Sequence, residues 1–314
     1  MGRIAVVFPG QGSQYVGMGR ELGSLFEEAN RIFQEAGEVL GYDLAQLIFE
    51  GPKEKLDLTV HTQPALVTTS VAFWKVLKSY GVEPDFFGGH SVGEYSALAA
   101  AGVLDWRDAL RAVSHRARFM EEAVPHGEGG MMAILGLSED KVEEICRKIR
   151  ENNGIVEVAN INCPGQVVIG GYNRGLEEAA ALAKQYGARK VVRLDVSGPF
   201  HTSLMRPAAD KLQAVLDGMT FAPARKPVVA NVDAGFPASG EEFKKALLRQ
   251  IVSPVQWEKC VRRLGDEGVS TFIEVGPGRT LTGLIRRILP EARVVRVEDG
   301  ETLENALASL KAGD

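Results

Sequence analysis

A serine held between two glycines, in the order strand, tight turn, helix, is the strongest constraint on the fold of this chain. Residues 89–93 read Gly-His-Ser-Val-Gly and fit the Gly-x-Ser-x-Gly pattern of a nucleophile elbow. Residues 84–87 suit the end of a strand, and residues 94–101 are rich in helix formers and precede Gly102. Glycine has no Cβ, so the chain can turn sharply and the helix can pack close to the strand. The pattern favours a catalytic Ser91 at the tip of the turn over a plain glycine-rich turn of an α/β fold.

Alternating strand and helix patterns surround this unit. Residues 3–8 read as a buried strand, followed by an amphipathic stretch near 20–40 and a helix near 63–80. A further helix is predicted from its N-cap Asp105 to about Ala123. The alternation resumes late in the chain, with helices between strands near 227–231, 270–275 and 292–297. This order predicts an α/β fold with a mainly parallel sheet and helices on both faces.

Residues 128–196 interrupt that alternation with a different order of elements. Strands are expected at 130–135, 155–161, 166–170 and 190–195, with helices at 138–152 and 173–186. The order β-α-β-β-α-β is that of a ferredoxin-like unit. We therefore expect a large domain from residues 1–127 and 197–314, with a small domain inserted at 128–196. A cleft between the two would suit a sizeable substrate.

Composition excludes several classes of function. The chain has 314 residues, 45% of them hydrophobic, and a formal net charge of −5, which gives no general electrostatic case for nucleic-acid binding. No apolar stretch approaches the length of a membrane helix, and the apolar run at the N-terminus is too short for a signal peptide. The three cysteines lack metal-ligand spacing and suit a reducing compartment. We expect a cytoplasmic protein that binds neither membranes nor nucleic acid.

A serine nucleophile needs a base, and the chain offers five histidines. His201 directly follows a predicted strand and precedes a helix, where catalytic groups often lie in such sheets. It also follows Ser91 in the chain, as in serine enzymes of α/β-hydrolase type. His90 adjoins Ser91, and neighbours on a sharp turn usually point apart. The other three lie in polar stretches and read as surface residues: His61, His115 and His126.

Two further groups could act on a substrate at Ser91. The main-chain N–H of Gln11, in the loop after the first strand, and that of Val92 are candidate oxyanion donors. Arg116 falls inside a predicted helix, where an arginine usually lies on a solvated face. If instead it were buried and faced the cleft, its guanidinium would be a fork for a carboxylate.

Several motifs, in this order along the chain, together resemble the acyltransferase family of fatty-acid and polyketide synthesis, and most closely the malonyl-CoA:acyl-carrier-protein transacylases. The resemblance covers nearly the whole chain and includes residues far from the elbow. It rests on the segments 8–14, 89–94, 116–125, 160–166, Phe200-His201, 250–255 and 274–278.

This resemblance implies a role for each candidate. Ser91 would attack the thioester of malonyl-CoA, and His201 would take its proton and later activate the incoming thiol. The N–H groups of Gln11 and Val92 would hold the oxyanion. Arg116 would pair with the free carboxylate of the malonyl group.

The resemblance also implies how the imidazole and the pocket are arranged. A main-chain carbonyl near Gln250, in place of an Asp or Glu, would orient the His201 ring. Asn162, Phe200 and His90 would line or orient the pocket. The fold would join a large α/β-hydrolase-like domain to an inserted ferredoxin-like domain. Exchange between thioesters needs no cofactor and no metal, and we expect a monomer.

The implied partners are malonyl-CoA and an acyl-carrier protein, which is typically acidic. A basic rim near the cleft is then expected, with ordinary surface charge as the alternative. Other functions stay open at this point, namely a polyketide-pathway acyltransferase, a serine thioesterase or hydrolase, and a non-enzymatic scaffold. The candidates for the rim are Lys184, Arg189, Lys190, Arg279, Arg286 and Arg287.

Overall fold

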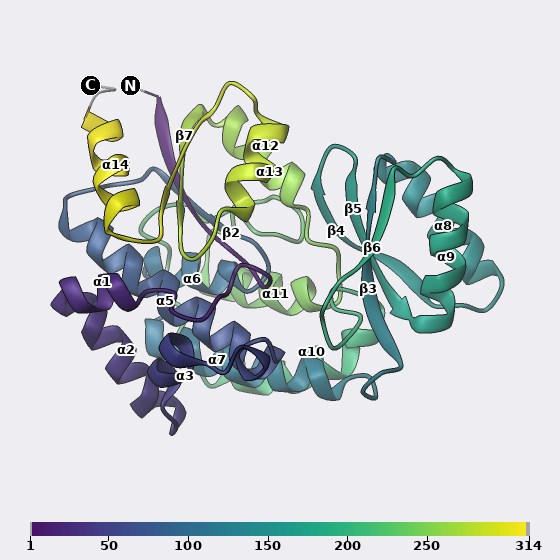
Figure 1. The fold of residues 1–314 in the computed structure, drawn as a ribbon, viewed down its shortest axis with the longest axis horizontal. Coiled ribbons are helices and arrows are strands. Elements are labelled where there is room, and N and C mark those ends of the chain that lie inside the picture. Colours follow the sequence, from purple (N-terminus) through teal and green to yellow (C-terminus); the bar gives the residue numbers. More distant parts are fainter. Residues whose placement is uncertain (1, 312–314) are drawn as a thin grey trace.

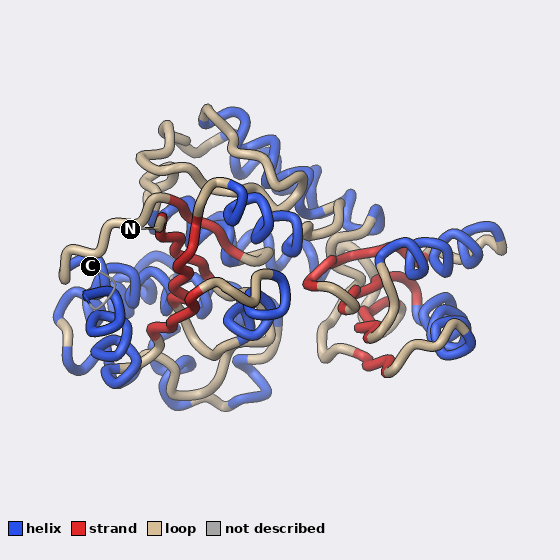
Figure 2. Tube along the Cα trace, turned by 90° about the horizontal axis from the view of Figure 1, so that it is seen from above, coloured by secondary structure: helices blue, strands red, loops and turns tan. Residues whose placement is uncertain are grey.

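Two separate four-stranded sheets organise residues 2–311, which are the residues that this computed structural model describes. The sheets lie apart, each with its own helices (Figures 1 and 2). The first sheet is parallel throughout, in the order β2-β1-β7-β8. Its strands are β1 (Arg3–Phe8), β2 (Phe86–Gly89), β7 (Val269–Val275) and β8 (Arg293–Val297).

The second sheet is antiparallel, in the order β4-β5-β3-β6. Its strands are β3 (Gly129–Leu135), β4 (Val156–Cys163), β5 (Gln166–Tyr172) and β6 (Lys190–Arg193). The helices α8 (Glu139–Glu151) and α9 (Asn173–Gln185) pack beside this sheet (Figure 1). Both helices are amphipathic and bury apolar residues such as Val142 and Leu176 in a core of their own. The result is a mixed α/β protein with one parallel and one antiparallel sheet.

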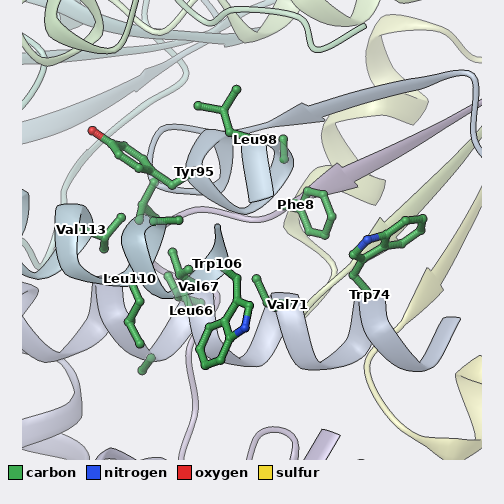
Figure 3. Close-up of a cluster of buried hydrophobic side chains, with 14 of the residues drawn as sticks. Phe8, Leu66, Val67, Val71, Trp74, Tyr95, Leu98, Trp106, Leu110 and Val113 are labelled. Carbon is green, nitrogen blue, oxygen red and sulfur yellow. The ribbon is translucent and has the colours of Figure 1, made fainter. Parts of the chain in front are cut away.

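Three helices build the main core beside the parallel sheet. They are α5 (Thr59–Ser79), which is buried along most of its length, α6 (Gly93–Ala100) and α7 (Trp106–Glu122). Figure 3 shows part of this core, where Phe8 of β1 lies among side chains of α5 and α6. Asp105 caps α7 by accepting a hydrogen bond from the Arg107 N–H, which confirms the predicted start of that helix.

The molecule thus has two units, the parallel sheet with its helices and the antiparallel sheet with α8 and α9, and the remaining helices pack around the first of them. They are α1 (Arg20–Leu25), α2 (Glu27–Leu40), α3 (Leu44–Glu50), α4 (Lys53–Leu56), the short 3₁₀ helix Ser203–Met205, α10 (Arg206–Asp217), α11 (Gly240–Ile251), α12 (Trp257–Asp266), α13 (Thr280–Ile288) and α14 (Gly300–Lys311). No helix within residues 2–311 is both long and apolar enough to cross a bilayer.

Two expectations need correction. The amphipathic stretch near 20–40 forms two helices, because the chain becomes extended at Phe26. The strand expected near 227–231 is wrong, since this segment makes only an isolated bridge between Val228 and Phe87. Pro227 has no N–H to donate, and the chain turns back soon afterwards, where the Ala234 N–H bonds to the Ala230 carbonyl.

The antiparallel sheet joins the rest of the molecule through β4. The Ile161 N–H donates to the carbonyl of Val255 at 2.9 Å, and the Val255 N–H donates to the carbonyl of Ala159 at 2.9 Å. The helices α12 and α13 also contact β4. Residues at the end of β4 are thereby held beside the carboxyl end of β2, where Ser91 lies.

Candidate active site

The elbow places Ser91 between β2 and α6 in a backbone conformation that few residues adopt. Its φ angle is 53°, in the left-handed region. A Cβ on Gly89 would lie 2.0 Å from the Gly93 carbonyl oxygen, and one on Gly93 would lie 2.2 Å from the Phe8 carbonyl oxygen. Both glycines are therefore required for the close approach of helix and strand that the sequence pattern predicted.

The structure brings His201 to Ser91. The Oγ of Ser91 lies 2.7 Å from Nε2 of His201, and Nδ1 of His201 lies 2.8 Å from the main-chain oxygen of Gln250. A carbonyl only accepts, so Nδ1 carries the proton and Nε2 is free to accept one from the serine. Burial, and then the charge of Arg116, lower the pKa of His201 to about 3. The imidazole is neutral at physiological pH, as a general base must be.

Arg116 is fully buried, so the solvated-face interpretation of this helical arginine is wrong. Its Nη2 donates to Ser91 Oγ at 3.1 Å and to Gln250 Oε1 at 3.0 Å, and its Nη1 donates to Gln63 Oε1 at 2.6 Å. Its Nε–H has no acceptor among residues 2–311. Burial lowers the pKa of Arg116, but a guanidinium keeps its charge in proteins. A positive fork therefore stands beside the serine.

A polar network that the sequence did not reveal supports the elbow from behind. Asn231 spans the turn, because its Oδ1 accepts from the Ser91 N–H at 2.7 Å and its Nδ2 donates to the Gly89 carbonyl at 2.7 Å. The Nε2 of Gln250 donates to the Ser91 carbonyl at 3.0 Å and to Glu94 Oε2 at 2.7 Å. These buried bonds hold the strained serine in place.

The two candidate oxyanion donors lie on facing segments. The loop that carries Gln11 approaches the elbow so closely that a Cβ on Gly10 would lie 2.6 Å from the His90 carbonyl. Val92 is the N-cap of α6, where helix N–H groups have no partner within the helix. Among residues 2–311, the main-chain N–H groups of Gln11 and Val92 donate no hydrogen bond to the protein. Both are available to an oxygen bound at the serine.

A pocket extends from Ser91 between the two units. Its polar lining includes Gln63 and the pair His90 and Asn162, in which Nε2 of His90 lies 2.9 Å from Oδ1 of Asn162. Burial lowers the pKa of His90, and its ring faces Asn162 rather than serving the serine. Apolar side chains from both units form the walls, including Met120, Met131, Val168, Leu194, Val196, Phe200 and Leu284. Such a site can form an ester on Ser91 and retain an acyl group that carries a negative charge.

Comparisons with known proteins agree with this chemistry. The family described as acyl transferase domain matches residues 5–304. The chain is 48% identical to the malonyl CoA-acyl carrier protein transacylase of Bacillus subtilis over 311 residues, which is 99% of this chain and 98% of that protein. It is 44% identical to the protein of the same name from Escherichia coli K12, over 98% of this chain and 99% of that protein.

Solved structures show the same fold. An acyl carrier protein S-malonyltransferase from Vibrio cholerae is 44% identical and superposes with a TM-score of 0.94, over 97% of this chain and 99% of that one. A malonyl-transacylase solved in complex with its type II polyketide-synthase acyl-carrier protein is also 44% identical. Its TM-score is 0.95, over 98% of this chain and 99% of that one.

Proposed function

The chain belongs to the acyl transferase domain family, and we propose that it transfers the malonyl group of malonyl-CoA to the phosphopantetheine thiol of an acyl-carrier protein for fatty-acid biosynthesis. One observation carries this proposal. The buried guanidinium of Arg116 lies 3.1 Å from the Oγ of Ser91, where it can pair with an acyl group that carries its own carboxylate.

The first half of the reaction forms an ester on Ser91. Its Oγ attacks the thioester carbon while Nε2 of His201 takes the hydroxyl proton, and the N–H groups of Gln11 and Val92 stabilise the oxyanion. The C–S bond then breaks, and the sulfur of coenzyme A leaves with the proton held by His201. The carbonyl of Gln250 keeps the imidazole in the tautomer that both transfers need.

The second half reverses these steps with a different thiol. His201 takes the proton of the phosphopantetheine thiol, whose sulfur attacks the ester carbon. The ester C–O bond breaks, and Ser91 regains its proton from His201. Over both halves one thioester is consumed and another is formed, so the exchange needs no external driving force. Asn162, His90 and Phe200 lie in the pocket and are proposed to orient the acyl group.

We also propose the finer description of the architecture. Residues 1–127 and 197–314 would form an α/β-hydrolase-like domain, and residues 128–196 an inserted ferredoxin-like domain. The spatial order β6-β3-β5-β4, with antiparallel pairing throughout, supports the ferredoxin-like description. A cytoplasmic monomer remains our expectation for the whole protein.

The serine ester provides the direct test. Malonyl-CoA alone should raise the mass of the peptide that contains Ser91 by one malonyl group, and Ser91→Ala should abolish the adduct. An adduct that persists in this variant would assign the nucleophile elsewhere. Adding phosphopantetheinylated carrier protein should discharge the ester onto the thiol, whereas a thioesterase would release free malonate at the same rate without it.

A polyketide pathway is the second candidate, favoured by the likeness to the malonyl-transacylase solved with a type II polyketide-synthase carrier protein. The chemistry at Ser91 would be identical, so only the carrier distinguishes the two. Transfer rates to a fatty-acid carrier and to a polyketide carrier, measured at equal concentration, would decide between them.

A further inference from the structure

A buried carboxylate stands behind the site without touching the reacting atoms. Glu94 lies in the first turn of α6 and is only 1% exposed. Its Oε2 accepts from Gln250 Nε2 at 2.7 Å and from the main-chain N–H of Asn231 at 3.2 Å. Taking an ionised carboxylate out of water is costly, so its presence here needs a reason.

The carboxamide of Gln250 links Glu94 to Arg116. Its Oε1 accepts from Arg116 Nη2 at 3.0 Å, while its Nε2 donates to Glu94. A guanidinium only donates and a carboxylate only accepts, so these neighbours allow one orientation of the amide. The same residue supplies the carbonyl that orients His201. Glu94 therefore influences Arg116 and His201 indirectly, through Gln250.

The negative charge of Glu94 and the positive charge of Arg116 lie on opposite sides of the Gln250 amide. In the free enzyme, Glu94 offsets the buried positive charge of Arg116. A malonyl group then brings a second carboxylate, and the enclosed site becomes negative overall. Without the charge of Glu94, the guanidinium and the malonyl carboxylate would form a neutral pair and hold each other more tightly. An ester held too tightly would be a poor donor to the next thiol.

Building on the proposed function, we propose that Glu94 is a positioning residue that fixes the amide of Gln250 and whose charge weakens the hold of Arg116 on the malonyl carboxylate. The malonyl group then remains easy to pass on. The same charge makes malonylation and protonation of Glu94 mutually favourable. Loading the enzyme with malonyl should therefore draw a proton from solvent.

The surroundings of Glu94 support proton uptake near neutral pH. Burial raises the pKa of Glu94 to about 7, against the lowering effects of the Gln250 and Asn231 hydrogen bonds and of Arg116. The other titratable groups near Glu94 are Tyr95 on the same helix, Asp233 in the turn after Asn231 and Cys260 on α12. His201 lies on the far side of Gln250 and bonds to its main-chain carbonyl.

Glu94→Gln tests this proposal, because it keeps the shape and an acceptor oxygen while removing the charge. The apparent KM for malonyl-CoA should fall on the order of tenfold at mildly alkaline pH, as expected for loss of one nearby charge at an effective dielectric constant near 20. The KM for acetyl-CoA, which has no carboxylate, should not change. The malonyl ester should also survive longer in the presence of carrier thiol.

Glu121→Gln is the matched control. Glu121 is a half-buried carboxylate on the same helix as Arg116, and burial also raises its pKa. Its bonds go to Ser197 and Thr59, so it has no link to Gln250. This variant should keep the wild-type KM for both substrates.

Proton uptake is a second measurement and needs no variant. Stoichiometric malonyl-CoA, added to the wild-type enzyme in weak buffer with a pH indicator, should cause uptake near neutral pH that Glu94→Gln lacks. An unchanged or raised KM for malonyl-CoA in Glu94→Gln would overturn the proposal. So would the absence of uptake in the wild type, even if the variant fails to fold. Failure to form the Ser91 ester at all would instead overturn the proposed function.

Discussion

The proposed role of Arg116, binding of the malonyl carboxylate, follows from its being both buried and adjacent to Ser91. In Arg116→Ala, malonyl transfer should fall by roughly two to four decades, since breaking a buried ion pair costs about 3–5 kcal/mol. Acetyl transfer should fall far less, so the preference for malonyl should narrow or invert. Initial rates with both thioesters measure the ratio. A variant that keeps a strong malonyl preference would mean that another group binds the carboxylate.

As the proposed general base, His201 should set the pH dependence of ester formation. Its pKa, lowered to about 3, leaves the ring neutral well below pH 6. At saturating malonyl-CoA, the single-turnover rate of ester formation should therefore stay level as the pH falls from about 8 to about 5. Rapid quench followed by mass analysis measures this rate. A decline with a midpoint near the ordinary histidine pKa would contradict the buried, neutral ring.

His201 also makes the stability of the folded protein depend on pH. The unfolded chain binds a proton at His201 below about pH 6.5 and the folded protein only near 3, so this contribution to stability is lost as the pH falls through that window. Glu94 acts in the opposite direction, because its raised pKa favours the folded state at low pH. Urea unfolding from pH 4 to 7 should therefore show a smaller acid loss in His201→Ala than in the wild type.

Local signals explain which site residues could be predicted from the sequence. Ser91 directly follows β2 of the parallel sheet, His201 comes after β6 of the antiparallel sheet, and the motifs around Arg116 indicated its role. Gln63 and Asn231 gave no such signal, because their partners lie 53 and 140 residues away in the sequence. Glu94 did offer one, since it is a charged residue at the start of an otherwise apolar, alanine-rich helix.

At the scale of elements, the contact between α6 and β1 depends on Gly93. Gly93→Ala should destabilise the protein by on the order of 3 kcal/mol, because the new methyl group would meet the Phe8 and Pro9 carbonyls at 2.2 and 2.7 Å and neither main chain can give way easily. Denaturant unfolding measures the loss. Gly283→Ala in α13 is the control, since nothing lies within 4 Å of its Cβ position. It should be neutral or slightly stabilising.

The order of elements was largely predictable, and the exception is the strand expected near residues 227–231. Strands and helices of residues 129–193 follow local periodicity, and each appears in the structure within a few residues of its expected place. The segment after Pro227 has the apolar composition of a strand but bonds to β2 only at Phe87. Its course is set instead by Asn231, which must reach the elbow. Composition alone could not reveal that tertiary requirement.

At the scale of the molecule, the site depends on how the two units meet. The pocket takes Ser91 from the elbow, Asn162 from β4 and Leu284 from α13, so neither unit alone would form it. Arg287 of α13 reaches across to the other unit, where it donates to Gln166 Oε1 at 3.1 Å. Since Gln166 lines the pocket, Arg287 lies at its rim, close to where a carrier protein must deliver its thiol.

Docking of an acidic carrier protein should therefore depend on exposed cations of this rim. Lys190→Glu or Arg287→Glu should raise the apparent KM for carrier protein several-fold while leaving the KM for malonyl-CoA unchanged, and transfer by the wild type should weaken as salt screens these charges. Lys78→Glu is the matched control. It makes the same charge change on α5, roughly 22 Å along the helix from Gln63 in the pocket. If the rim variants behave like Lys78→Glu, and transfer does not respond to salt, then the carrier protein docks on another face.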